Sequence, residues 1–461
     1  MTNTNNLLVN AKGCCAPQER TLNTKSVSNN LQGQLPVAII GAGPIGLAAA
    51  AHLASRGQKF ILIDCGSGVG ANVLTWGHIR LFSPWRYNVD KVARSLLEQS
   101  NWTHPDFERL PTGKELVEQY LEPLSNLSKI RPYIQLNTKV VSIGKKDTDK
   151  MKTLNRESLP FIIHTESNGS YKTLEARSVI DATGTWGNPN PATSSGIWLK
   201  EEKSLHEQVF YGIPNILEKE KERYANNRVA VVGGGHSAIN TLLDLAKLKE
   251  TYNKTEIIWI MRRQRVEDAY GGEEKDALVA RGKLGSRIHS LIDEQKIKVV
   301  TPFRILEVRK TQEGIMIKGN KNNEESTLNG IDEVIVNTGS RPDLTILSEV
   351  RIEIDSTTES VKALAPLIDP NIHSCGTVRP HGERELRQPE KDLYIVGAKS
   401  YGRAPTFLMA TGYEQVRSIV AYLSGDVESS EKVELDLPET GVCSVNYNTK
   451  KSGCDDSTSC N

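Results

Sequence analysis

Residues 36–51 read PVAIIGAGPIGLAAAA. Val37–Ile40 is a continuous apolar run, which is typical of a parallel strand buried on both faces. The motif Gly41-x-Gly43-x-x-Gly46 follows at once, and a helix-forming run extends from there to Ser55. A strand, a glycine-rich turn and a helix in this order predict a nucleotide-binding α/β unit.

The three glycines have different mechanical tasks in such a turn. Gly41 makes the tight bend, Gly43 lets the backbone approach a pyrophosphate, and Gly46 packs the helix closely on the strand. With Pro44 at its start, the helix points its free N–H groups at the pyrophosphate. The next expected strand ends in Asp64, eighteen residues after Gly46, where a carboxylate can accept both hydroxyls of an adenosine ribose. We therefore predict a first dinucleotide site here.

The same pattern returns 192 positions later, from Gly41 to Gly233. The turn Gly233-Gly234-Gly235-His236-Ser237-Ala238 is a GxGxxA variant, and the strand after it ends in Arg262-Arg263 rather than in a carboxylate. A carboxylate would repel a 2′-phosphate, whereas paired guanidiniums bind one as bidentate donors. The second dinucleotide is therefore expected to be NADPH, and the first to lack a 2′-phosphate. His236 is expected either to contact the nicotinamide nucleotide or to have a packing or capping role.

Three further apolar strands end in small-residue turns, at Ser178–Gly184, Glu333–Gly339 and Leu393–Ala398, and a helix-compatible stretch runs from about Pro405 to Leu423. This order predicts an α/β fold with two Rossmann-like dinucleotide-binding domains, the second inserted into a discontinuous first one. The expected boundaries are a mobile polar arm (1–34), the first domain's first part (35–190), the inserted NADPH-binding domain (191–335), the first domain's second part (336–425) and a cysteine-containing tail (426–461).

Composition excludes several classes of protein. The 461 residues include 57 Lys+Arg and 56 Asp+Glu, a formal net charge of +1. A neutral chain without a dominant basic block is not expected to bind nucleic acid or an anionic membrane. Residues 36–51 are the least charged stretch, but glycines and a proline interrupt them and they are too short to span a bilayer comfortably. The polar stretch that precedes them argues against a signal peptide. We expect a soluble, cytoplasmic protein.

Seven cysteines in a chain of this length indicate free thiols in a reducing compartment. Cys443, Cys454 and Cys460 are soft thiols that suit soft metalloid ions, although solvated tail residues without a task are the alternative. No fixed metal-site spacing appears, so we predict no metal site. Cys375 is expected either to line a substrate pocket or to be a buried structural thiol. Cys14, Cys15 and Cys65 complete the set.

These motifs resemble those of the two-dinucleotide-binding-domain flavoproteins over about residues 35–425. In that superfamily the first site holds FAD and the second NADPH, and the two Thr-Gly turns are crossovers between the domains. The last glycine motif usually reads Gly-Asp, whereas this chain has Gly397-Ala398. The cofactor-binding residues implied are Gly41, Gly43, Pro44, Gly46, Asp64, Cys65, Trp76, Arg80, Ser83, Ala182, Thr183, Gly184, Gly233, Gly235, His236, Ser237, Ala238, Arg262, Arg263, Thr338, Gly339, Gly397 and Ala398.

The subfamily follows from what surrounds the flavin. Thioredoxin-reductase and dihydrolipoamide-reductase types carry a CxxC or CxxxxC there, whereas Cys65 stands alone, so a generic disulfide reductase is disfavoured. Residues 70–85, GANVLTWGHIRLFSPW, resemble the flavin-facing region of class B flavin monooxygenases, although the FxGxxxHxxx fingerprint is absent. The whole chain resembles the flavin monooxygenases of bacterial arsenic-resistance operons, through the stretches WGHIRLFSPWRYNVD, HSCGTVRPHG, SYGRAPTFLMATGYEQVRS and LPETGVCS.

The resemblance implies an NADPH- and O2-dependent monooxygenase that acts through a C4a-(hydro)peroxyflavin on a small soft nucleophile, such as a trivalent (organo)arsenical. The flavin carries the hard chemistry, so we name no catalytic residue. The helix after Ala404 is expected to direct its N-terminus at the flavin pyrimidine. One alternative is an NADPH-dependent flavin reductase of a metalloid or disulfide that uses the tail cysteines. Another is a redox-responsive or metalloid-sequestering flavin-binding protein. Expected partners are a small-molecule substrate and O2, with a homodimer left open.

Overall fold

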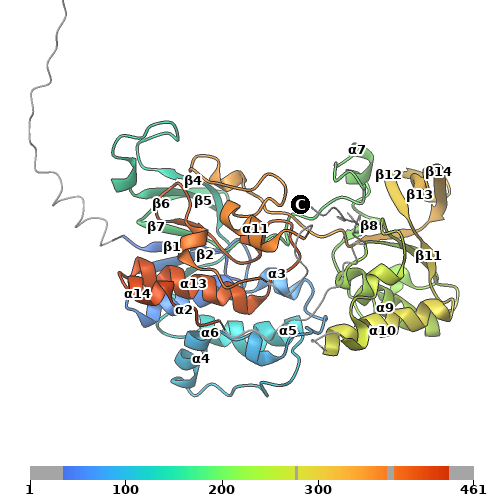
Figure 1. Cartoon of the computed structure of the whole chain (residues 1–461), viewed down its shortest axis with the longest axis horizontal. Coiled ribbons are helices and arrows are strands. Elements are labelled where there is room, and N and C mark those ends of the chain that lie inside the picture. Colours follow the sequence, from blue (N-terminus) through green and yellow to red (C-terminus); the bar gives the residue numbers. More distant parts are fainter. Residues whose placement is uncertain (1–34, 276–278, 371–377, 436–461) are drawn as a thin grey trace, which may run out of the picture.

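The computed structural model describes residues 35–275, 279–370 and 378–435, and these fold into two lobes (Figure 1). The predicted polar arm, most of the predicted tail, and Cys14, Cys15, Cys375, Cys443, Cys454 and Cys460 lie outside the described residues. Within the described ranges, no helix has the length and apolar character needed to cross a membrane.

The first lobe is built on a parallel sheet with the strand order β16-β7-β1-β2-β3. The central strand β1 pairs with β2 on one side and with β7 on the other, and all four of its residues are buried. Figure 1 shows α2 and α13 on one side of this sheet and the antiparallel β4-β5-β6 sheet on the other, which explains the apolar run. The strands are β1 (Val37–Ile40), β2 (Phe60–Ile63), β3 (Ile134–Gln135), β4 (Lys139–Lys145), β5 (Phe161–Ser167), β6 (Ser170–Ala176), β7 (Ser178–Asp181) and β16 (Leu393–Ile395).

Helices α2 and α13 lie against each other through a glycine. A Cβ at Gly412 would lie 2.5 Å from Ile45 Cδ1, so a side chain here would force Ile45 to shift. The helix expected from about Pro405 begins four residues later, at Met409, because the residue before it, Leu408, has an extended backbone (φ −120°, ψ 147°). The helices of this lobe are α2 (Pro44–Ser55), α3 (Ala71–Leu74), α4 (Lys91–Glu98), α5 (Gly113–Leu116), α6 (Glu122–Ser125), α11 (Ala365–Ile368), α12 (Glu383–Leu386), α13 (Met409–Leu423) and α14 (Val427–Glu431).

The second lobe repeats the parallel plan with the order β11-β10-β9-β15-β8. Val229 and Val231 of β9 pack in one core with α9 and α10, while Ala230 and Val232 pack in another with the β12-β13-β14 sheet. Both faces of β9 are thus buried. The elements are α7 (Lys200–Lys203), β8 (Val209–Tyr211), α8 (Lys221–Tyr224), β9 (Arg228–Val232), α9 (His236–Thr251), β10 (Glu256–Ile260), α10 (Val279–Asp293), β11 (Lys298–Val300), β12 (Phe303–Thr311), β13 (Gly314–Lys321), β14 (Glu324–Ile331) and β15 (Glu333–Val336).

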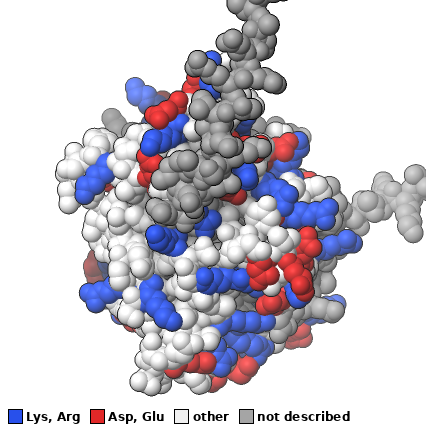
Figure 2. All heavy atoms as spheres, turned by 90° about the vertical axis from the view of Figure 1, so that its left-hand side faces the viewer, with Lys and Arg blue, Asp and Glu red and all other residues white. Residues whose placement is uncertain are grey.

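Two antiparallel crossovers join the lobes. Asn190 N donates to Gly339 O at 2.9 Å, and Arg341 N donates to Asn188 O at 3.0 Å. The chain then returns to the first sheet, where β16 pairs with β7. The predicted α/β fold with two parallel sheets is therefore confirmed, and the domain boundaries given above stay predictions. On the end of the first lobe that Figure 2 shows, basic and acidic side chains are interspersed among uncharged ones.

A buried ion pair ties the β4-β5-β6 sheet to the segment before β16. The guanidinium of Arg156 contacts the Glu390 carboxylate with Nη2–Oε2 at 2.8 Å, and the two side chains are 2% and 3% exposed. Arg156 also donates to Asp149 O at 2.6 Å. A buried guanidinium with its partner removed keeps its desolvation cost without the compensating attraction.

Replacing Glu390 by glutamine should therefore lower the free energy of unfolding by about 3 kcal/mol or more. The matched control is Glu98→Gln, which breaks the exposed Arg94–Glu98 pair and should cost less than about 0.5 kcal/mol. Urea unfolding followed by circular dichroism measures both. Equal effects of the two substitutions would contradict the role of the buried pair.

Candidate functional site

The glycine turn after β1 has the division of tasks that its sequence predicts. Gly41 has a φ of +105°, and a Cβ there would lie 2.6 Å from the carbonyl oxygen of Ala182. A Cβ at Gly46 would lie 1.8 Å from Gly41 O, whereas a Cβ at Gly43 would meet nothing within 4 Å. Two glycines therefore close the turn, and the third leaves room for a pyrophosphate.

Two helix N-termini converge on this turn. Gly43 caps α2 without a side-chain hydrogen bond, and Leu408 caps α13 likewise. A Cβ at Gly397, which has a φ of +68°, would lie 3.2 Å from Ile45 Cγ1, so the turn after β16 also abuts the start of α2. Uncapped N–H groups and the positive ends of two helix dipoles favour an anionic ligand in this place.

Asp64 directly follows β2, and its carboxylate bonds the backbone of the glycine turn. Its Oδ2 accepts from Ala42 N and its Oδ1 from Gly66 N, both at 2.6 Å. Each carboxylate oxygen keeps acceptor capacity for a ribose hydroxyl. The neighbouring residue Cys65 is exposed overall, but partial desolvation of its thiol, together with the Asp64 carboxylate, raises the pKa of that thiol. At neutral pH Cys65 is therefore a protonated, weakly nucleophilic thiol.

The turn after β9 repeats this geometry. Gly233 has a φ of +139°, and a Cβ there would lie 2.4 Å from Asn337 O, the residue that follows β15. Gly235 caps α9 without a side chain, and a Cβ there would meet nothing within 4 Å. Ala238, in the third position, is completely buried. The second lobe thus has its own open space at a helix N-terminus.

The two predicted arginines take different positions around this second turn. Arg263 Nε lies 3.1 Å from the Cβ position of Gly234, so the guanidinium lies over the turn. Arg262 is directed elsewhere and donates to Ser194 O at 3.3 Å. Arg265 pairs with Asp268 at 3.2 Å. The structure thus brings Arg263 to the glycine turn.

Aromatic residues of both lobes meet between the two turns. The Phe82 ring lies 5.6 Å from the His236 ring, centroid to centroid. Trp76 lies 6.2 Å from Trp186, whose Nε1 donates to Thr75 Oγ1 at 2.7 Å. The segment that was predicted to face the flavin therefore contacts the second glycine turn through Phe82.

Other predicted residues of this segment point elsewhere. Arg80 is exposed and donates to Leu110 O at 2.6 Å, and Ser83 Oγ donates to Asn88 Oδ1 at 3.0 Å. Burial lowers the pKa of His78, whose Nε2 has no hydrogen-bond partner within the described part of the chain. No group of three or more His, Cys, Asp or Glu side chains suited to a metal occurs among the described residues.

A buried lysine supports the first turn, and sequence reasoning missed it. Lys399 Nζ lies 2.7 Å from Asp181 Oδ2 and 2.9 Å from Thr183 Oγ1, and both charged side chains are almost fully buried. Thr183 N and Oγ1 bond the other oxygen of Asp181. This network holds the residues on either side of Ala182, and the carbonyl oxygen of Ala182 lies against Gly41. The available signal was the departure from the usual Gly-Asp motif. This chain has Gly397-Ala398 in place of that motif, and Lys399 follows directly.

Comparisons with known proteins agree with this geometry. The model of a family described as pyridine nucleotide-disulphide oxidoreductase matches residues 38–366. The ferredoxin–NADP reductase of Lactobacillus gasseri is 24% identical over 342 residues, which is 74% of this chain and 85% of that protein.

Solved structures show the same fold. The bacillithiol disulfide reductase Bdr (YpdA) of Bacillus cereus has a TM-score of 0.63 at 18% identity and covers 85% of this chain and 99% of its own. DfoA, the FAD-bound cadaverine monooxygenase of the desferrioxamine pathway of Erwinia amylovora, has a TM-score of 0.61 at 15% identity, over 88% and 97%. The fold is therefore shared by reductases and by a monooxygenase.

The glycine geometry leads to a prediction for a matched pair of variants. Gly43→Ala puts a methyl group into open space, so its unfolding free energy should stay within about 1 kcal/mol of the parent. Because the methyl group occupies the path of the pyrophosphate, FAD affinity should fall about tenfold or more. Gly46→Ala has no room for its Cβ and should lose folded yield. Flavin absorbance per protein after gel filtration and urea unfolding measure these effects, and full flavin content in Gly43→Ala contradicts the assignment.

Proposed function

The chain belongs to the pyridine nucleotide-disulphide oxidoreductase family, and from that premise we propose that it is an NADPH- and O2-dependent flavoprotein monooxygenase of a small soft nucleophile, such as a trivalent (organo)arsenical. In this proposal the Gly41–Gly46 turn and Asp64 hold FAD, and the Gly233–Ala238 turn and Arg263 hold NADPH. When bound, the flavin accepts hydride and activates O2. The protein's own residues bind and orient the cofactors and keep water away from them.

The lone Cys65 is the observation that carries the choice of oxygen as electron acceptor. A disulfide reductase of this fold passes electrons through two sulfurs in exchange distance. Within the described ranges Cys65 is the only free cysteine, and its raised pKa keeps it protonated. It also follows Asp64, at the ribose end of the turn. The described residues therefore offer no dithiol relay, which supports O2 as the acceptor.

The aromatic contacts between the lobes support the exclusion of water. Phe82 belongs to the first lobe and His236 to the second, and their rings contact each other. Trp186, at the start of the crossover between the lobes, contacts Trp76 of the first lobe. Apolar ring surface between the two glycine turns keeps the space where hydride passes poor in water, and this protects a reduced cofactor from unproductive reactions. The substrate class rests on the resemblance of residues 76–90 to the arsenic-operon monooxygenases.

A second candidate is an NADPH-dependent reductase of a metalloid or disulfide. Its support is the fold shared with a bacillithiol disulfide reductase, together with the cysteines of residues 436–461. The two candidates differ in their need for oxygen. A monooxygenase converts NADPH, H⁺, O2 and substrate to NADP⁺, water and the oxygenated substrate, whereas a reductase turns over under strict anaerobiosis.

The test is NADPH and O2 consumption by the purified yellow protein with methylarsonite, arsenite, a thioether or an amine. With the right substrate, we expect the protein to consume one O2 and to form one oxygenated product per NADPH. Hydrogen peroxide, detected by the addition of catalase, should not accumulate. Stoichiometric substrate reduction without O2 would support the reductase instead. Consumption that yields only peroxide with every substrate would contradict both proposals.

Cofactor selectivity provides a separate prediction. Removing the Arg263 guanidinium by Arg263→Ala deletes a charge-assisted partner of the 2′-phosphate, so KM for NADPH should rise about ten- to a hundredfold. KM for NADH, which lacks that phosphate, should stay unchanged. Arg265→Ala is the matched control, because Arg265 pairs with Asp268. Steady-state kinetics with both nucleotides decide the matter, and an equal effect on NADPH and NADH contradicts the proposed contact.

A further inference from the structure

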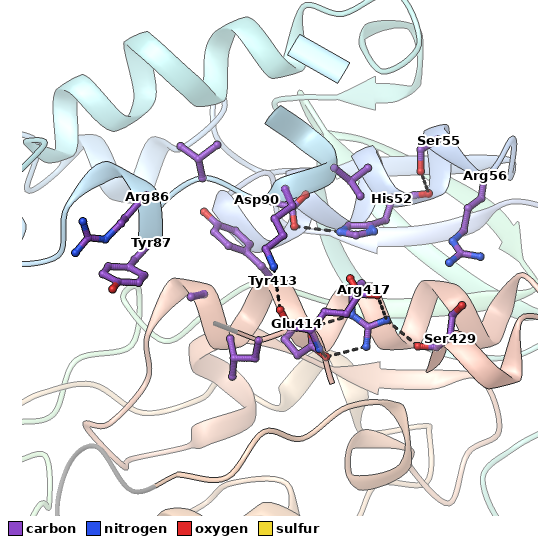
Figure 3. A pocket seen from close by; sticks show the side chains of 16 residues that line it. His52, Ser55, Arg56, Arg86, Tyr87, Asp90, Tyr413, Glu414, Arg417 and Ser429 are labelled. Carbon is purple, nitrogen blue, oxygen red and sulfur yellow. Dashed lines mark hydrogen bonds and ion pairs between the residues drawn. The ribbon is translucent and has the colours of Figure 1, made fainter. Parts of the chain in front are cut away.

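A cavity of about 520 Å³ lies on the first lobe between α2, α4 and α13 (Figure 3). Two side-chain pairs with little exposure form part of its wall: a hydrogen-bonded pair with His52 Nε2 3.1 Å from Asp90 Oδ2, and an ion pair with Arg417 Nη2 2.7 Å from Glu414 Oε1. Its apolar lining comes from Val89, Val92, Tyr413 and Leu435. Most of its charged groups already have partners, so the cavity does not have the free charge that a small ionic ligand would need.

The chain itself enters this cavity after α14. The extended segment 432–435, here called the strap, leaves the helix with Lys432 at φ −69° and ψ 141°. Arg417 donates to Lys432 O, Glu434 N donates to Glu414 Oε1 at 3.1 Å, and Lys91 Nζ donates to Glu434 O at 3.1 Å. The backbone of Lys432 contacts Arg417, whereas the backbone of Glu434 contacts Glu414, which lies nearer the start of α13, and the Glu434 carboxylate stays 4.0 Å from Arg417 Nη1. The strap therefore runs antiparallel to α13, toward the N-terminus of that helix.

That end of α13 adjoins the first glycine turn. The helix begins at Met409, and Gly412 packs on Ile45 at the start of α2. On the opposite wall of the cavity, Tyr87 lies five residues after Phe82, which contacts His236 of the second turn. The strap thus points from the back of the first lobe to the space between the two glycine turns.

The sequence after Leu435 has the length and the pattern to continue this path. Residues 436–443 read DLPETGVC. Eight extended residues span about 26 Å, whereas the five helical residues from Glu414 back to Met409 span only about 8 Å. In an extended chain Leu437 shares the face of Leu435, which lines the cavity. Asp436 and Glu439 carry negative charge, and the Lys91 ammonium in the cavity lining bonds a backbone carbonyl rather than a carboxylate.

We propose that this cavity is the docking groove of the chain's own C-terminal segment, in which residues 436–443 continue along α13 and bring Cys443 to the edge of the space between the glycine turns. This proposal concerns where the segment binds, and it does not rest on the monooxygenase activity. The proposal distinguishes the three terminal cysteines. Residues 436–443 bound in the groove would place Cys443 at its end, whereas Cys454 and Cys460 lie farther along the chain.

Disulfide trapping in the full-length chain tests the proposal. Tyr87→Cys and, on the opposite wall, Ala410→Cys each place a thiol at the end of the groove. Mild oxidation with diamide, which takes up the two electrons and two protons of the thiol pair, should link the introduced thiol to Cys443. Peptide mapping under non-reducing conditions identifies the bond. Adding Cys443→Ser should abolish it. Met151→Cys, on a residue 88% exposed and not part of the cavity lining, is the control and should not link to Cys443.

A pair of variants, one in the strap and one just after it, adds a second measurement in the Tyr87→Cys chain. Leu437→Asp should reduce the yield of the disulfide about tenfold, because docking would then bury a carboxylate in the place of an apolar side chain. Val433→Asp changes a residue that is 59% exposed and should leave the yield unchanged. Equal linking from positions 87 and 151, linking shared evenly among Cys443, Cys454 and Cys460, or no linking from either groove position overturns the proposal. None of these outcomes depends on enzymatic activity.

Discussion

Both lobes depend on the same contact, a glycine with positive φ pressed against a backbone carbonyl of the neighbouring strand end. Gly41 abuts Ala182 O, and Gly233 abuts Asn337 O. Each carbonyl belongs to the first residue after a strand that leads into a crossover, so one contact closes the glycine turn at the point where the chain leaves the sheet. The open space at Gly43 or Gly235, the direction of the following helix and the position of the crossovers all follow from it. A side chain at either glycine would separate the turn from the crossover.

The two halves differ where their ligands should differ. The first has Asp64 bonded to the turn, and the second has Arg263 over it. The first turn is also supported by Lys399, which pairs with Asp181, and both side chains are almost completely buried. A buried pair of this kind adds little net stability over an apolar substitute, but it penalises any arrangement that separates the partners. Its value here is positional, since it holds the carbonyl against which Gly41 closes.

Local patterns were sufficient to predict the strands, the glycine turns and the order of the lobes, because apolar runs and glycine spacing act over a few residues. Contacts between distant segments were not predictable in this way. Lys399 and Asp181 are 218 positions apart, and nothing in either neighbourhood indicates that they meet. The choice between Arg262 and Arg263 depends on the side-chain direction after β10, and the contact of Phe82 with His236 depends on how two lobes pack. The groove needs α2, α4, α13 and the strap together, so the tail cysteines had no assigned place in the sequence reading.

If two dinucleotides bind in the two separate turns, they should exchange electrons across the space between them. The most direct test of this exchange is an anaerobic titration of the purified yellow protein with NADPH, followed by the visible absorbance of the oxidised flavin. One equivalent of NADPH should bleach one bound flavin, and NADH at the same concentration should do so much more slowly. A flavin that stays oxidised although NADPH binds would contradict it, and would leave the flavin with a structural role.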